Sequence, residues 1–139
     1  MIQQKHTFYV PYSDTDKMGC AHHSNYLKYY EVARWELLRN IGLPYSEIET
    51  LGYYLPVISA NLHFQKPSTY DSQLTVHSRL VNFSGAKVNF NYKIYNQEHI
   101  LINEGDTTLA FVRKENWKPC AIPLFFKSKI NDYLKNNDI

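Results

Sequence analysis

The side chains best suited to chemistry lie in one short segment, residues 12–26. This segment contains two carboxylates, a glycine and two adjacent imidazoles, at Asp14, Asp16, Gly19, His22 and His23. It leads into a run with helical periodicity, so the start of a helix is expected beside it. Acyl transfer requires a base or nucleophile next to backbone N–H groups that can receive a developing oxyanion. The composition of this segment therefore favours acyl-transfer chemistry.

The two carboxylates also have an explanation without chemistry. Asp14 and Asp16 are two residues apart at the end of an expected strand, so they share a face if the extended geometry persists. Both could instead bond to nearby backbone N–H groups in an Asx-type turn. Gly19 could allow a bound group to approach the backbone closely, or could serve a tight turn. The helix that follows favours the functional interpretation, because its amide dipoles attract negative charge at its start.

The adjacent histidines, His22 and His23, are the second feature of the segment. Two imidazoles and a carboxylate could bind zinc, yet the sequence has neither a His-x3-His spacing nor a distal cysteine cluster. We therefore expect no metal site. If catalytic, one imidazole would orient a thioester or donate a proton to the departing group. Otherwise the two are polar loop residues or partners of a buried hydrogen bond.

Acids elsewhere in the chain are weaker candidates. Glu31 lies roughly 140° around the expected helix from its tyrosine stripe, so it faces away from the buried side. Glu36 and Arg39 are more simply a solvated i, i+3 pair. Two further acids, Glu104 and Asp106, flank Gly105, which suggests a solvated β-bulge.

A possible phosphate-binding turn occurs later in the chain. Ser84, Gly85 and Lys87 combine free turn N–H groups with an ammonium, a combination that can cradle phosphate but is common by chance. Three other cations could contribute or could be ordinary solvated residues, at Arg79, Arg113 and Lys114.

Hydrophobic periodicity predicts one long helix followed by a series of strands. The helix covers Tyr26–Ile41, with Ser24 or Asn25 as its cap and Gly42 and then Pro44 at its end. Strands are expected at residues 5–13, 58–64, 74–80, 88–94 and 99–113, a short helical turn at 46–51 and a terminal helix at 123–134. This order indicates an α+β fold in which a curved antiparallel sheet wraps around the helix. Such a sheet keeps edge strands that a second copy could cover, so we expect a dimer.

Length and composition limit the remaining possibilities. The 139 residues show no repeat or linker, so we expect one domain over residues 1–139. The net charge of +2 comes from scattered basic residues, which excludes a general nucleic-acid binder. No stretch is apolar and long enough to span a membrane. Cys20 and Cys120 match no metal or redox spacing, and we expect two reduced thiols in a cytoplasmic protein.

Together, these residues resemble a known family. The run Tyr12-Ser13-Asp14-Thr15-Asp16, then Gly19, His22-His23-Ser24-Asn25-Tyr26 and Tyr30-Glu31-Val32-Ala33-Arg34, is similar to the hotdog-fold acyl-CoA thioesterases. The branch is that of 4-hydroxybenzoyl-CoA thioesterase, with the thioesterases associated with the Tol–Pal system as the nearest group. Weaker similarity continues through Gly52–Val57 and Lys66–Asp71.

The resemblance implies a fold and a set of roles. It implies a hotdog fold, with a five-stranded antiparallel sheet around the helix, paired into a homodimer or a dimer-of-dimers tetramer with active sites between protomers. It assigns catalysis to Asp16, with His23 as an auxiliary, and the polarising helix start to residues 23–26. Substrate-binding residues would be Gly19, Asn25 and Tyr26, with Ser84, Gly85 and Lys87 near the coenzyme A moiety. Lys17-Met18, Cys20-Ala21 and His22 depart from the usual pattern.

The resulting prediction is hydrolysis of an acyl-CoA thioester to a carboxylate and free coenzyme A, with no metal or redox cofactor. Asp16 would act either as a general base on water or as a nucleophile through a mixed anhydride. Two alternatives belong to other classes. One is a non-catalytic module that binds acyl-CoA or an acyl carrier, and the other is a hotdog dehydratase, which usually pairs a histidine with a helix-borne acid.

Overall fold

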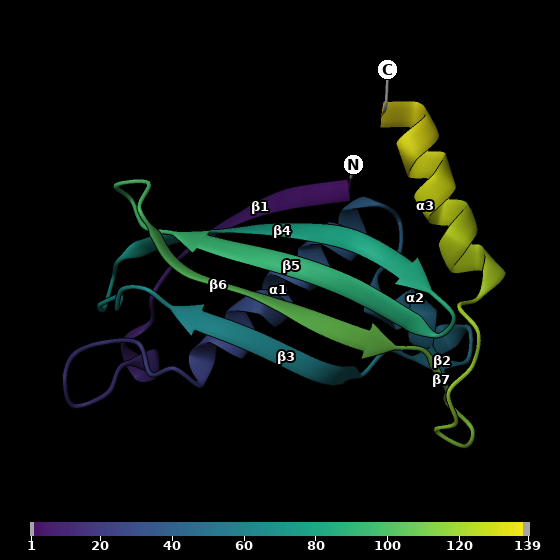
Figure 1. The fold of residues 1–139 in the computed structure, drawn as a ribbon, viewed down its shortest axis with the longest axis horizontal. Coiled ribbons are helices and arrows are strands. Elements are labelled where there is room, and N and C mark those ends of the chain that lie inside the picture. The colour runs from purple at the N-terminus through teal and green to yellow at the C-terminus, as the bar shows by residue number, and fades with distance from the viewer. Residues whose placement is uncertain (1, 138–139) are drawn as a thin grey trace.

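The main element of the protein is a five-stranded antiparallel sheet that wraps around one long helix (Figure 1). The computed structural model describes residues 2–137. The strand order is β1-β4-β5-β6-β3, and every neighbouring pair is antiparallel. The bounds are β1 Ile2–Tyr9, α1 Asn25–Asn40, β3 Val57–Phe64, β4 Gln73–Ser84, β5 Lys87–Tyr95 and β6 Leu101–Ala110. This arrangement confirms the expected α+β hotdog architecture.

Smaller elements complete the two ends of the sheet. They are the 3-10 turn η1 (Tyr12–Asp14), helix α2 (Tyr45–Thr50), the two-stranded pair β2 (Tyr53–Tyr54) and β7 (Val112–Arg113), and helix α3 (Leu124–Asn137). Helix α3 projects from one end of the sheet (Figure 1) and is anchored by the buried side chains of Phe126 and Ile130. No helix within residues 2–137 is both long and apolar enough to cross a bilayer.

Helix α1 buries the stripe that its periodicity predicted. Its buried side chains are Tyr26, Tyr29, Tyr30, Ala33, Arg34, Leu37 and Leu38. The ring of Tyr30 stacks on that of Tyr92 from β5, with the centroids 4.2 Å apart and the planes 5° from parallel. The helix therefore lies against the middle of the sheet, and its N-terminus is held at one end.

Gly105 makes this close approach possible, and the expected bulge there is wrong. Strand β6 pairs in regular register through Gly105 with Leu62 on one side and Tyr92 on the other. A Cβ atom at this position would lie 2.7 Å from the Tyr30 hydroxyl oxygen and closer still to the Asn61 carbonyl oxygen. The glycine is thus required by both the neighbouring strand and the helix, because any side chain would collide with the Asn61 backbone and with the Tyr30 ring.

One strand boundary and one helix cap differ from the prediction. Strand β1 ends at Tyr9, because Pro11 cannot continue the ladder and the next residues form η1. Ser24 occupies the N-cap position of α1 but makes no capping hydrogen bond with its side chain. The C-terminal end of the helix agrees with expectation, since Gly42 adopts a φ of 87° in the left-handed region.

Strand β3 forms an open edge of the sheet. The strand was predicted correctly, but its burial does not alternate, and its apolar side chains are largely exposed in the single chain, including Ile58 at 52% and Phe64 at 51%. Within residues 2–137, the outer side of β3 has no strand partner. An apolar edge with unpaired backbone groups is a surface that proteins normally cover.

The contact at Gly105 predicts a large effect of one methyl group. Gly105→Ala should lower the free energy of unfolding by about 2–3 kcal/mol, because the new Cβ overpacks the contacts with the Asn61 carbonyl and with Tyr30. Urea denaturation measures this change. The neighbouring Asp106→Ala, on the exposed face of the same strand, should change stability by less than about 0.5 kcal/mol. A Gly105→Ala protein as stable as the Asp106→Ala control would contradict the proposed role of the glycine.

Candidate active site

The polar segment folds into a compact loop beside the start of α1. It passes through η1, turns at Gly19 with a φ of 78°, and closes through isolated bridges that pair Thr15 with Ala21 and Cys20 with Thr69. The Asp16 N–H donates to the Cys20 carbonyl at 2.9 Å, and the Gly19 N–H donates to the Asp16 carbonyl at 3.0 Å. The glycine therefore serves a tight turn, one of the two roles that its place in the sequence allows.

Asp14 is a buried structural carboxylate. Its side chain is 5% exposed and accepts hydrogen bonds from Lys28 Nζ at 2.8 Å and from the Tyr29 hydroxyl at 2.7 Å. Burial, together with this hydrogen bond, raises the pKa of Tyr29, so the phenol stays protonated and remains a donor. The Asp14 carbonyl also accepts from the His22 N–H and the Asn25 side-chain amide. Asp14 therefore fastens the loop to the first turns of α1.

Asp16 has one oxygen engaged by the loop and one available. Its Oδ1 accepts from the Met18 N–H at 2.9 Å and the Cys20 N–H at 3.3 Å, so an Asx-type turn is indeed present. Its Oδ2 accepts no hydrogen bond from residues 2–137. The two backbone donors fix the carboxylate in orientation without using its full capacity as an acceptor.

Asp16 borders a surface hollow of about 440 Å³ between the loop, α1 and the end of β3. The lining residues are Asp16, Met18, Cys20, Ala21, His23, Tyr26, Phe64, Gln65, Lys66 and Pro67. Aromatic edges form one wall, since the Phe64 ring lies 5.2 Å from the Tyr26 ring and 6.4 Å from the His23 ring, both at nearly right angles. The hollow thus places a carboxylate and an imidazole against an apolar wall.

Tyr26 contributes to this wall as a neutral group. Its hydroxyl lies 2.9 Å from Ser68 Oγ, and burial raises its pKa above the usual value for tyrosine. The phenol is therefore protonated at neutral pH and cannot act as a base there.

The helix start offers fewer free N–H groups than expected. The N–H groups of Asn25 and Tyr26 donate to the carbonyls of His22 and His23, at 3.0 and 3.2 Å. The Ser24 N–H donates to His22 Nδ1 at 3.3 Å. The His23 N–H has no acceptor within residues 2–137, so it is the donor in this turn that remains for a ligand. Asn25 uses its side-chain amide on Asp14, and its role in binding substrate stays a prediction.

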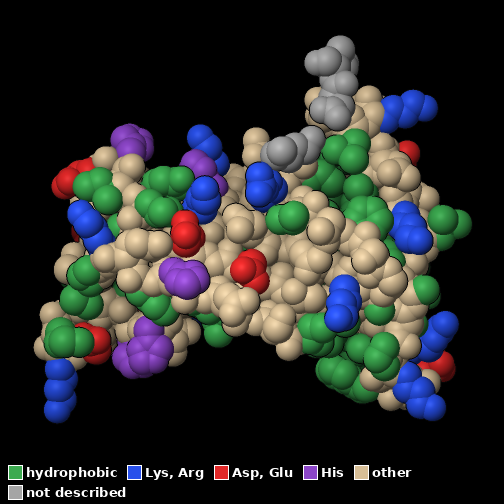
Figure 2. All heavy atoms as spheres, in the orientation of Figure 1, with side chains coloured by type: hydrophobic (Ala, Val, Ile, Leu, Met, Phe, Trp, Pro, Cys, Tyr) green, Lys and Arg blue, Asp and Glu red, His purple; other side chains and the backbone are tan. Residues whose placement is uncertain are grey.

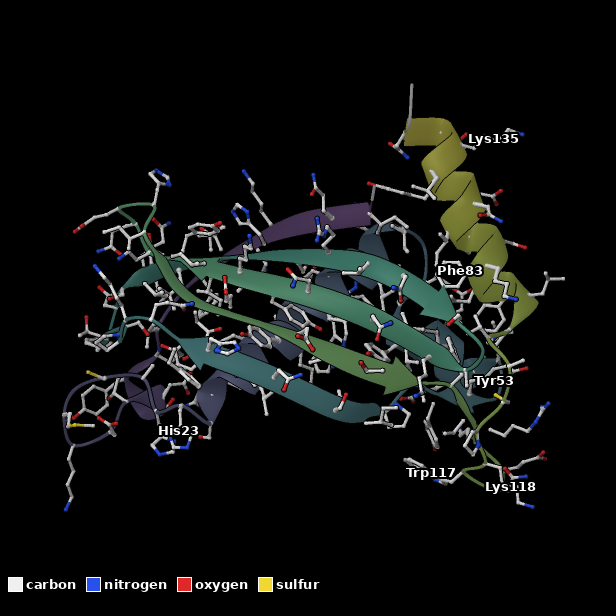
Figure 3. All side chains as sticks on the ribbon, viewed as in Figure 1. His23, Tyr53, Phe83, Trp117, Lys118 and Lys135 are labelled. Carbon is white, nitrogen blue, oxygen red and sulfur yellow. The ribbon has the colours of Figure 1, made fainter. Side chains whose placement is uncertain are left out.

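The predicted phosphate-binding turn is far from this hollow in the single chain. Ser84, Gly85 and Lys87 form the β4–β5 hairpin turn, in which Ser84 pairs with Lys87 and Gly85 has a φ of 62°. His23 and Phe83 mark the two regions at opposite ends of the molecule (Figure 3). The structure therefore brings together Asp16, Gly19, His23 and Tyr26, but not the residues of this turn.

Phe64 and Lys66 line the hollow and were not identified from the sequence. Phe64 alternates like an ordinary core residue, and only its place at the end of an edge strand exposes it. Glu31 does not line the hollow, and Glu36 forms the expected exposed pair with Arg39 at 2.8 Å. No group of three or more metal-ligating side chains occurs in the described part of the chain.

Comparisons with known proteins match the chain to thioesterases. A family model described as the Thioesterase-like superfamily matches residues 10–130. The chain is 36% identical over 110 residues to the Bacillus subtilis protein named "Putative acyl-CoA thioesterase YneP", covering 79% of this chain and 80% of that protein. It is 28% identical over 114 residues to the Escherichia coli O6:H1 acyl-CoA thioester hydrolase YbgC, covering 82% and 85%. A DHNA-CoA thioesterase structure from Staphylococcus aureus superposes with a TM-score of 0.89 at 27% identity, covering 100% and 97%.

The two carboxylates of the loop should differ in their effect on stability. Asp14→Ala should lower the free energy of unfolding by about 2 kcal/mol, because it leaves the buried Tyr29 hydroxyl without an acceptor. Asp16→Asn should change stability by less than about 0.5 kcal/mol, because its remaining Oδ1 still accepts the two loop N–H groups. Urea denaturation of both variants measures the difference. Equal losses would contradict a structural role confined to Asp14.

Proposed function

This chain belongs to the Thioesterase-like superfamily, and from that membership we propose that it hydrolyses acyl-CoA thioesters to a carboxylate and free coenzyme A. The observation that carries the proposal is that Asp16 and His23 line the same hollow, and that within residues 2–137 the Asp16 Oδ2 and the His23 N–H make no hydrogen bond. Both thiols of the chain are free, and we place the reaction in the reducing environment of the cytoplasm.

In the proposed mechanism, the thioester carbonyl lies in the hollow with its oxygen towards the His23 N–H. Asp16 Oδ2 either removes a proton from water that attacks the carbonyl carbon, or attacks that carbon itself. The attack makes the carbonyl oxygen an oxyanion, which the N–H stabilises, and the carbon–sulfur bond then breaks to release the coenzyme A thiolate. In the second route, water hydrolyses the resulting mixed anhydride and regenerates the carboxylate.

The proposed reaction uses a second copy of the chain. The hollow is open next to Phe64, at the end of the exposed β3 edge. Pairing two β3 strands around a twofold axis would join two sheets and cover Ile58 and Phe64. The same axis would bring the opposite end of the partner, which carries Ser84, Gly85 and Lys87, towards the hollow (Figure 1). We therefore propose a homodimer as the active unit.

Replacing the proposed catalytic carboxylate should abolish most activity. Asp16→Asn should lower kcat by about 10²–10⁴-fold, because an amide is neither a base nor a nucleophile. Release of free thiol from a panel of short, long and aromatic acyl-CoA substrates measures this effect. Asp106→Asn, an acid on the exposed face of β6, is the matched control and should retain normal activity. Near-normal turnover by Asp16→Asn across the whole panel would overturn the assignment.

A charge on the β3 edge should separate the subunits. Ile58→Lys should yield a monomer with little hydrolytic activity, whereas the native chain should sediment as a dimer. Val81→Lys, on a similarly exposed apolar position of β4, is the control and should remain dimeric. Sedimentation analysis of the three proteins measures their masses. A native chain that sediments as a monomer while hydrolysing thioesters would refute the proposed active unit.

A further inference from the structure

A pair of aromatic rings, one exposed and one half-buried, lies at the end of the molecule opposite the hollow. The ring of Trp117, in the hairpin that follows β7, lies 5.1 Å from the ring of Tyr54 in β2, with 35° between their planes. Trp117 is 61% exposed, so much of this residue remains accessible to a ligand. Exposed tryptophans are unusual in isolated chains and are enriched where proteins bind partners or ligands.

The hairpin holds Trp117 in a costly backbone conformation. Its φ is 59°, in the left-handed region that bulky side chains rarely adopt. The conformation is fixed by hydrogen bonds from the Trp117 N–H to the Arg113 carbonyl at 2.8 Å and from the Lys118 N–H to Asn116 Oδ1 at 2.9 Å. Strain of this kind persists where the surroundings impose it, and it is concentrated at functional sites. The hairpin thus presents a fixed indole ring.

The hairpin that carries Trp117 also carries three cations. Lys114 Nζ lies 5.9 Å from the centre of the Tyr54 ring, and Arg113 and Lys118 are neighbouring exposed cations of the same hairpin. One acid, Glu115, accompanies them, and none of the three cations forms an ion pair with residues 2–137. A hollow of about 450 Å³ adjoins Arg113 and Lys114. In Figure 2, apolar side chains at the lower right lie beside this basic group.

We propose that this aromatic and basic hairpin binds the adenine nucleotide end of the thioester substrate. A planar base can stack on the ring of Trp117, and its phosphates can meet Lys114, Arg113 and Lys118. Neither group alone selects such a ligand, but an aromatic ring beside cations that form no ion pair within residues 2–137 matches a base that carries phosphates. This inference rests on the proposed function, because coenzyme A is the nucleotide-bearing part of the proposed substrate.

The geometry assigns the hairpin of one subunit to the hollow of the other. Within one chain, His23 and Trp117 lie at opposite ends of the molecule, and both extend past the open β3 edge (Figure 3). A twofold axis through that edge exchanges the two ends. It therefore carries the partner's Trp117 to the side of the His23 hollow, where the long pantetheine arm can connect the two sites.

Fluorescence tests the binding site independently of catalysis. Trp35 is the other tryptophan, so Trp35→Phe leaves Trp117 as the reporter. Adenosine 3′,5′-bisphosphate should quench this emission in a saturable way, whereas ribose 5-phosphate, which lacks the base, should not. Absence of saturable quenching would overturn the inference even if the protein hydrolyses thioesters. Quenching without hydrolysis of any thioester would instead refute the proposed function and leave the nucleotide site standing.

Kinetics test the assignment to the substrate. Trp117→Ala should raise KM for an acyl-CoA about tenfold, because one base-stacking contact is lost, and should leave kcat unchanged. It should not alter hydrolysis of the matching acyl-pantetheine, which has no nucleotide. Leu124→Ala, an exposed apolar residue of α3, is the control. Equal effects on both substrates, or loss of the dimer on sedimentation, would show that Trp117 supports the structure rather than the nucleotide.

Mixed dimers test which subunit supplies the hairpin. Consider a dimer of one Asp16→Asn chain and one Trp117→Ala chain. If each site combines Asp16 of one chain with Trp117 of the other, one of the two sites has both native residues. Such a dimer should regain hydrolysis with the native KM at about half the native kcat per dimer. If the hairpin instead served the hollow of its own chain, no site would be native and only the raised KM would be observed. That result would overturn the assignment between subunits.

Discussion

The packing of α1 against the sheet is the contact on which the rest of the structure depends. Tyr30 stacks on Tyr92 above the bare backbone of Gly105, and its hydroxyl donates to Asn103. One turn further along the helix, the buried Arg34 donates to the hydroxyls of Tyr45 and Tyr92, both at 3.0 Å. Burial raises the pKa of both phenols, so neutral oxygens solvate this cation. Together, these aromatic and polar contacts fix the depth and rotation of α1, and therefore the position of its first turn.

A helix held in this way allows the two neighbouring carboxylates to serve different purposes. Asp14 is buried and directs its oxygens towards Lys28 and Tyr29, so it joins the loop to α1. Asp16, two residues later, is oriented by loop N–H groups but keeps one oxygen open to the hollow. Reactive groups must be positioned by rigid neighbours. The buried acid supplies that rigidity, which leaves the half-buried acid available for chemistry.

The sequence predicted the positions of helices and strands more reliably than the burial and contacts of their side chains. The tyrosine stripe of α1 and the alternation in β4 and β5 reported periodicity directly, and those elements formed where expected. Gly105 was misinterpreted as a bulge, because its real requirement is a contact with a helix that lies far away in the chain. Phe64 is exposed because β3 lies at the edge of the sheet. The order of strands in a sheet cannot be predicted from the local sequence pattern. Likewise, only the three-dimensional structure reveals that helix-start N–H groups are already bonded, leaving that of His23.

The separation between the two ends of the chain gives the open β3 edge its significance. One end holds a carboxylate, an imidazole and an apolar wall, and the other holds an exposed indole on a hairpin with three cations. The proposed substrate, with a reactive thioester at one end and a charged nucleotide at the other, would use both surfaces. A single chain places them too far apart and on the same side of an uncovered edge (Figure 3). In the proposed dimer, a twofold axis perpendicular to that edge would place each of the two surfaces beside the other surface of the partner chain, so that two complete sites form. Pairing of the two β3 strands would then both cover the apolar edge and complete the site. Selection for a covered edge would therefore also maintain the complete site.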